Sequence, residues 1–110
     1  NEKEAFVLLG AMRGQGESAV GVLAMLIRQF RILLHIRLMK AEGRAGGEMQ
    51  KLLGIPGFAL RRAEDQAARF TAENLRASLD MLLDTDDAIK SGRMREDAAL
   101  ERALLLLRRA

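Results

Sequence analysis

The stretch IRQFRILLHIR, Ile27 to Arg37, decides the fold class because it combines an apolar helical pattern with several basic side chains. It belongs to a longer apolar segment that begins near Ala19 and ends near Glu42, just before Gly43. This segment predicts one helix of about 35 Å, at 1.5 Å per residue. The stretch is too apolar for a free surface helix and too basic for an ordinary core helix. We therefore expect a helix that is contacted on two sides.

A helical wheel of this segment shows a basic stripe with apolar side chains on both sides of it. The basic stripe consists of Arg28, Arg31 and His35. The first apolar flank consists of Val20, Leu23, Ile27, Phe30, Leu34 and Leu38. The second apolar flank consists of Met25, Ile32, Ile36 and Met39. One flank is expected to face the core of the domain, and the other to face either a neighbouring helix of the same domain or another subunit.

The rest of the chain favours an all-α fold, a single compact bundle of five to six helices. Of the 110 residues, 49% are hydrophobic and 30% are charged, and there is one proline. Ala, Leu, Arg, Glu and Met are abundant, and all are good helix formers. Ser18 and Thr71 are predicted helix N-caps. Helices are expected over residues 2–13, 19–42, 48–53, 58–70, 72–91 and 96–109. The short glycine-containing turns between them favour antiparallel neighbours.

The polar residues argue against catalysis. His35 is the only histidine, and most hydroxyl groups fall at helix ends, so no nucleophile has an evident base. The acidic group Asp84, Asp86 and Asp87 lacks the spacing of a calcium loop and predicts a solvated helix face. Asp86 and Lys90 form an i, i+4 pair, which contributes about 0.3–0.5 kcal/mol on an exposed helix. We expect no enzymatic activity, no cofactor and no metal site.

Charge and cysteine content place few limits on the partners. The net charge of +3 permits contact with nucleic acid or with an acidic protein and requires neither. The chain has no cysteine, which fits a reducing compartment. The longest apolar run, residues 19–27, is shorter than the roughly 20 residues that span a bilayer, and no secretory leader opens the sequence. We expect a cytoplasmic location and no membrane contact.

A segment in the middle of the chain offers an alternative function. EMQKLLGIPGFALRRAEDQA, residues 48–67, contains a short helix, a glycine turn and a second helix, as in a helix-turn-helix. In a DNA-binding module of this kind, Arg61, Arg62 and Arg69 would contact phosphates or bases. Glu64 and Asp65 lie on the same predicted helix and would repel phosphate. Helix-turn-helix DNA binding is therefore kept as the alternative hypothesis.

Several segments together resemble the C-terminal domain of the delta subunit of bacterial DNA polymerase III. They are QGES leading into MLIRQFRILLHIRL, then KLLGIPGFALRRAEDQAARFT, then LLDTDDAIKSG, then ALERALLLL. The segments occur in the family's order and spacing and cover nearly all of the chain. The resemblance implies that residues 1–110 are a helical collar-type domain, a fragment of a longer chain that begins one helix into the family's C-terminal domain.

The resemblance also implies a function. Delta subunits are similar to AAA+ proteins in architecture but lack ATPase function, although the holoenzyme is a DNA-directed DNA polymerase. Their C-terminal domain joins those of the gamma/tau and delta-prime subunits in a closed collar that holds the clamp loader together. Their N-terminal domains, which this chain does not include, bind the sliding clamp. A non-catalytic assembly domain that supports clamp loading during DNA replication is therefore expected, with only indirect contact to DNA.

Two motifs of the family can be matched to particular residues of this chain. The family's RQxR pattern matches residues 28–31, and its DxxxKxG pattern matches residues 86–92. The family does not make these residues catalytic, so we expect them to pack helices and contact subunits. The interface candidates are Arg28, Phe30, Arg31, His35, Asp86 and Lys90. Self-association of the fragment is a further expectation, because a missing helix would expose core surface.

Overall fold

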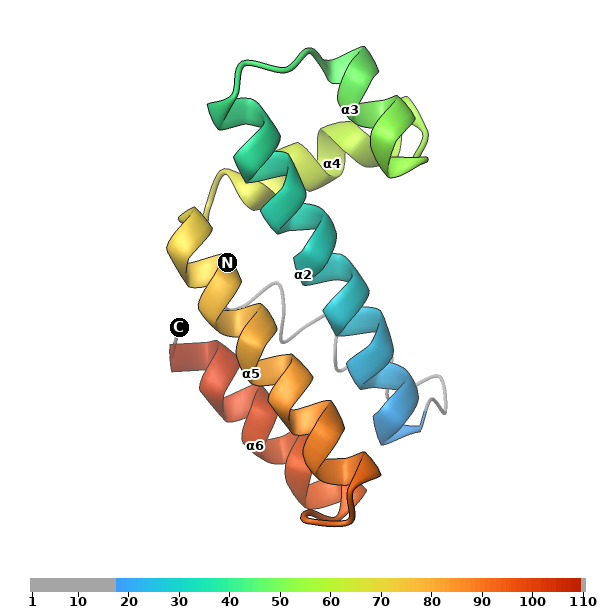
Figure 1. Cartoon of the computed structure of the whole chain (residues 1–110), viewed down its shortest axis with the longest axis vertical. Helices are drawn as coiled ribbons and strands as arrows, with labels where there is room; N and C mark the ends of the chain where they lie inside the picture. The colour runs from blue at the N-terminus through green and yellow to red at the C-terminus, as the bar shows by residue number, and fades with distance from the viewer. Residues whose placement is uncertain (1–17, 110) are drawn as a thin grey trace.

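The computed structural model describes residues 18–109, and this part of the chain is built of α-helices without any strand. The helices are α2 (Ala19–Ala41), α3 (Gly46–Leu53), α4 (Gly57–Ala67), α5 (Ala72–Lys90) and α6 (Glu96–Arg109) (Figure 1). The all-α prediction is confirmed, and the helices lie close to their predicted bounds. The helix predicted over residues 2–13 lies outside the described residues.

Helix α2 is the element around which the other helices are arranged. Helix α5 runs antiparallel to α2 and α6 runs antiparallel to α5, whereas α3 and α4 lie at the C-terminal end of α2 (Figure 1). Across residues 18–109, the Cα atoms of α3 and α4 come within 8 Å of α2 and of each other, but not of α5 or α6. The fold therefore consists of two helix pairs, α3–α4 and α5–α6, that share α2.

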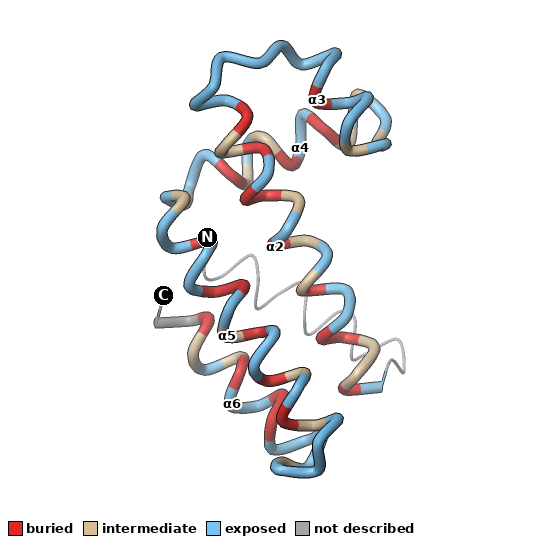
Figure 2. The backbone as a smooth tube through the Cα atoms, viewed as in Figure 1, coloured by how far each residue is buried: buried red, intermediate tan, exposed pale blue. Residues whose placement is uncertain are grey.

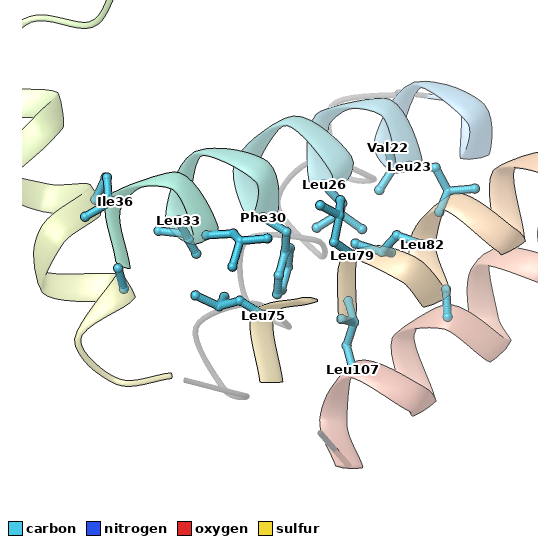
Figure 3. Close-up of a cluster of buried hydrophobic side chains, with 14 of the residues drawn as sticks. Val22, Leu23, Leu26, Phe30, Leu33, Ile36, Leu75, Leu79, Leu82 and Leu107 are labelled. Carbon is cyan, nitrogen blue, oxygen red and sulfur yellow. The ribbon is translucent and has the colours of Figure 1, made fainter. Parts of the chain in front are cut away.

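The main core lies where α2, α5 and α6 meet. Figure 3 shows a continuous cluster of buried side chains that includes Val22, Leu23, Leu26, Phe30, Leu33, Leu75, Leu79, Leu82 and Leu107. Leu26 is 1% exposed and Leu82 is fully buried. Burying a leucine side chain contributes about 1.5–3 kcal/mol. Of the first apolar flank of α2, Leu23, Phe30 and Leu34 are buried in this core, which confirms the prediction for these three, whereas the other three residues are half-buried. Val22, Leu26 and Leu33 belong to neither predicted flank and are also buried, so the buried face of α2 is centred beside the predicted one.

The second apolar flank of α2 is only partly covered. Ile36 and Met39 are buried in the core cluster together with Met49 of α3. Ile32 is half-buried, and Met25 is 43% exposed. Neighbouring helices of the same domain therefore cover this flank near α3 and α4, which confirms that alternative for Ile36 and Met39. Toward the N-terminus of α2 the flank remains open in the described part of the chain.

The local signals that delimit the helices act as the sequence predicts. Ser18 Oγ accepts a hydrogen bond from the Gly21 amide at 3.0 Å, and Thr71 Oγ1 accepts one from the Asn74 amide at 3.0 Å. Each cap satisfies a backbone donor that the first turn of a helix leaves unpaired. Gly54 ends α3 in the left-handed region with φ 65°, which glycine adopts without steric cost.

Removal of the Thr71 cap is expected to weaken the start of α5. We expect Thr71→Ala to lower the free energy of unfolding by about 1 kcal/mol, because the Asn74 amide loses its acceptor. Thr71→Ser keeps a hydroxyl group and is the matched control, with most of the stability retained. Urea unfolding followed by far-UV circular dichroism measures both. An equal loss in the two variants would show that the cap hydrogen bond is not the cause.

Helix α2 is long and apolar enough to cross a membrane by length and composition alone. It has 23 residues, and its most apolar window has a mean hydropathy of 1.6. Core helices of helical domains pass the same test, and 44% of this window is buried inside the fold. Since α2 also packs against all four other described helices, we assign it as the core helix of the domain.

Candidate protein-binding site

The basic stripe of α2 lies on the surface. Arg28, Arg31 and His35 are all exposed. Because they are spaced i, i+3 and i+7, they follow one face of the helix for about 10 Å. Within residues 18–109, neither arginine has a hydrogen-bond or ion-pair partner. The two guanidinium groups can therefore pair with groups on another molecule.

Two open grooves border this stripe. The first groove, of about 380 Å³, lies between α2 and α3 and is lined by Ala24, Ile27, Arg28, Arg31, Ile32, His35, Leu52 and Leu53. The second groove, of about 350 Å³, lies between α2 and α4 and is lined by Arg28, Gln29, Ile32, Ile55, Phe58, Ala59, Arg62, Ala63 and Gln66. Arg28 and Ile32 border both grooves, so the two grooves are adjacent and together make up the candidate site.

Two large apolar side chains in these grooves were missed by the sequence analysis. Leu52 of α3 is 61% exposed in the first groove, and Phe58 of α4 is 65% exposed in the second. A signal for Phe58 existed in the sequence. On a helical wheel Phe58 lies almost opposite Leu60 and Ala63, the residues that α4 buries. A single exposed apolar residue is common on protein surfaces, but Phe58 lines a groove together with Ile32 and Ile55, and such a grouping indicates a contact with another molecule.

Polar contacts hold α4 against α2. Gln29 Nε2 donates a hydrogen bond to Gln66 Oε1 at 2.8 Å, and both residues line the second groove. Nearer the end of α2, Lys40 Nζ lies 2.8 Å from Glu64 Oε2. This partly exposed ion pair adds little stability on its own. Its effect is to neutralise the negative charge of Glu64. This carboxylate therefore cancels less of the positive charge that the arginines give to the grooves.

The remaining interface candidates lie away from the grooves. Phe30 is 4% exposed, so the structure corrects its assignment: it faces α5 and belongs to the core. Asp86 and Lys90 form the predicted pair, with Lys90 Nζ 2.7 Å from Asp86 Oδ2. They lie in the last turns of α5, at the end of the bundle away from α3 and α4 (Figure 1). The structure therefore brings only Arg28, Arg31 and His35 together.

The residues of the helix-turn-helix hypothesis have different surroundings. Arg61 and Arg62 are exposed on α4, and Arg69 is exposed just after it. Figure 2 shows exposed residues along the outer sides of α3 and α4 and through the turn before α3. Of these three arginines, only Arg62 also lines a groove.

Across residues 18–109, no three His, Asp or Glu side chains are arranged to hold a metal ion.

Comparisons with known proteins agree with the helical architecture. Residues 1–107 match the family described as DNA polymerase III delta subunit, C-terminal domain. The chain is 30% identical over 93 residues to DNA polymerase III subunit delta of Bacillus subtilis (strain 168), a match that covers 84% of this chain and 27% of that protein. The solved structure of the Bacillus subtilis DNA clamp loader delta protein superposes with a TM-score of 0.85 at 26% identity, over 98% of this chain and 32% of that chain.

These matches bear on both hypotheses from the sequence. The chain spans about a third or less of the length of the two relatives. The matches do not favour the helix-turn-helix alternative, since the α3–α4 segment falls inside the family match as part of a larger helical domain. With the family match over residues 1–107 and the superposition over nearly the whole chain, this chain belongs to the DNA polymerase III delta subunit, C-terminal domain family.

Proposed function

We propose that this chain is a non-catalytic assembly domain of the DNA polymerase III clamp loader, and that it supports sliding-clamp loading during DNA replication. Residues 1–110 would form one collar-type domain of a longer chain. Its neighbours would be the corresponding domains of the gamma/tau and delta-prime subunits. The observation that carries the proposal is the pair of grooves, which combine arginines without partners and exposed apolar side chains.

The composition of the grooves suits a protein interface. Arginine and aromatic residues are enriched in the centres of such interfaces. Arg28 lies between the two grooves, with Leu52 on one side and Phe58 on the other. A partner that covers this surface would remove two exposed apolar side chains from water. Each groove is open to solvent, which suits a helix or a loop of another protein better than a small ligand that must be enclosed.

The domain would contribute rigid helix faces rather than chemistry. Subunits that hydrolyse ATP need a fixed point against which their movements act, and a packed helical domain provides one. In this proposal the delta subunit has no ATPase function of its own, and the domain needs no cofactor. The complex would work in the cytoplasm, and this domain would contact DNA only indirectly.

Charge reversal in the basic stripe tests this assignment. In the full-length chain, we expect Arg28→Glu combined with Arg31→Glu to weaken binding to gamma/tau by on the order of 1,000-fold, since two interface hot spots of about 2 kcal/mol each amount to about 4 kcal/mol. Both residues are exposed, so helicity should remain unchanged in far-UV circular dichroism. Co-purification and a binding titration measure the effect.

A matched control separates this effect from net charge. Arg76→Glu combined with Arg95→Glu changes the charge by the same amount at exposed positions outside both grooves. We expect the control variant to assemble like the wild type. Normal assembly of the Arg28/Arg31 variant would mean that the basic stripe is not a subunit contact.

A further inference from the structure

We propose that the occupant of the two grooves is an acidic amphipathic helix of a neighbouring subunit, whose carboxylates pair with Arg28, Arg31 and Arg62. The inference rests on the proposed function and adds to it the chemistry of the partner surface. It depends on three features of the grooves: their charge, the spacing of their arginines and the position of their apolar side chains.

The charge of the grooves is uniformly positive. Neither groove has an aspartate or glutamate among its lining residues, whereas Arg28, Arg31 and Arg62 line one or both of them. In the part of the chain that the structure describes, these three guanidinium groups have no internal partner. Two basic residues just outside the grooves do have partners within the chain. Lys40 pairs with Glu64 and Arg44 pairs with Glu48, each at 2.8 Å. A cleft with charge of one sign concentrates the field and attracts the opposite charge.

The spacing of the arginines suits carboxylates on a helix. Arg28 and Arg31 are three residues apart on α2, and a guanidinium fork can bind a carboxylate through two hydrogen bonds. Arg62 projects from α4 on the opposite side of the second groove. Acidic residues at positions i and i+3 or i+4 of a partner helix lie about 5–6 Å apart. Such a helix could therefore present one carboxylate to each arginine of α2 and others to Arg62.

The apolar side chains determine that the partner is amphipathic. Leu52 and Phe58 are exposed, one in each groove, and Ile32 lies half-buried between them. A polyanion such as duplex DNA would neutralise the arginines but would leave Leu52 and Phe58 in water. A helix with apolar residues between its carboxylates satisfies both kinds of group. The combination of unpaired cations and exposed apolar groups therefore favours a protein helix over nucleic acid.

Two pairs of substitutions in the full-length chain test separately whether the partner helix is acidic and whether it has an apolar face. Arg28→Gln with Arg31→Gln removes the charge, and Leu52→Ser with Phe58→Ser removes the apolar surface. We measure the Kd for the purified gamma/tau and delta-prime subunits at several salt concentrations. Each pair should weaken binding at least tenfold. Binding by the wild type should weaken with salt, and the glutamine variant should show a smaller salt dependence, because its ion pairs are gone. Arg76→Gln with Arg95→Gln is the control, with unchanged binding.

The outcomes distinguish this inference from the proposed function. If only the serine pair weakens binding and the salt dependence is unchanged, the partner face is apolar and the acidic helix is ruled out, whereas the assembly role stands. If neither pair weakens binding, the surface of the two grooves is not a subunit interface. The acidic partner helix and the assembly role proposed for these grooves would then both be wrong. Loss of duplex DNA binding in the glutamine variant, with subunit binding intact, would identify phosphate as the ligand and overturn the inference. Sedimentation that shows a dimer of the wild type, but not of the glutamine variant, would identify a second copy of this chain and overturn it as well.

Discussion

Replacement of Phe30 by alanine is expected to lower the free energy of unfolding by about 3–5 kcal/mol. The Phe30 ring is almost completely buried between α2 and α5 and meets the edge of the Phe70 ring, with the centroids 6.1 Å apart. An aromatic pair of this kind adds about 0.5–1.5 kcal/mol to the effect of burial. Since domains are stable by only about 5–15 kcal/mol in total, the variant would lose a large part of its stability.

The chain offers a matched control for this substitution. Phe58→Ala removes the same side chain from an exposed position in the second groove, and such changes usually stay within about 0.5 kcal/mol. Urea unfolding of both variants, followed by far-UV circular dichroism, measures the difference. Binding to the partner subunits should show the reverse order, with Phe58→Ala the more harmful in the folded protein. If the two variants were equally stable, Phe30 would not belong to the core.

Ile36→Ala should have the second large effect, a loss of about 2–5 kcal/mol. Ile36 is completely buried and lies at the end of the core cluster nearest to α4 (Figure 3). Together with Met39 and Met49 it attaches α3 and α4 to α2. Because this helix pair has no backbone contact with α5 or α6, the loss should be concentrated there. Hydrogen exchange should accelerate more in α3 and α4 than in α5.

Met25→Ala is the control for Ile36, because Met25 lies on the same apolar flank of α2 but is 43% exposed. We expect its effect on stability to stay within about 0.5 kcal/mol. Comparing Ile36→Ala with Met25→Ala shows whether the loss of stability comes from the burial of the side chain or from its place on this flank of α2. If Ile36→Ala accelerated exchange equally in every helix, the two helix pairs would behave as one cooperative unit.

The bounds of most helices could be predicted because the deciding signals are local. Ser18 and Thr71 cap the helices that follow them, and Gly54 ends α3. The end of α4 could not be predicted. The pattern suggested a helix as far as Phe70, but α4 ends at Ala67, and the Arg69 and Phe70 amides donate to carbonyls three residues earlier. This tighter turn accompanies the contact of the Phe70 ring with Phe30, a tertiary contact that no local pattern contains.

The candidate site could be predicted only in part for the same reason. Arg28, Arg31 and His35 form a stripe in any helix, because their spacing alone decides it. Leu52 and Phe58 come from other helices, and their place beside the stripe depends on how α3 and α4 pack. Burial on the second flank of α2 also depends on that packing, and periodicity alone does not separate its buried residues from its exposed ones.

In residues 18–109, α3–α4 and α5–α6 have no Cα atoms within 8 Å of each other and are joined by α2 and by the short connection of residues 68–71. We therefore expect a load applied at the grooves to reach the far end of the bundle mainly as a tilt of α2 or as a rotation of α2 about its own axis. Stiffness against bending in this one helix would therefore determine how faithfully movement is transmitted between neighbours on opposite ends of the domain.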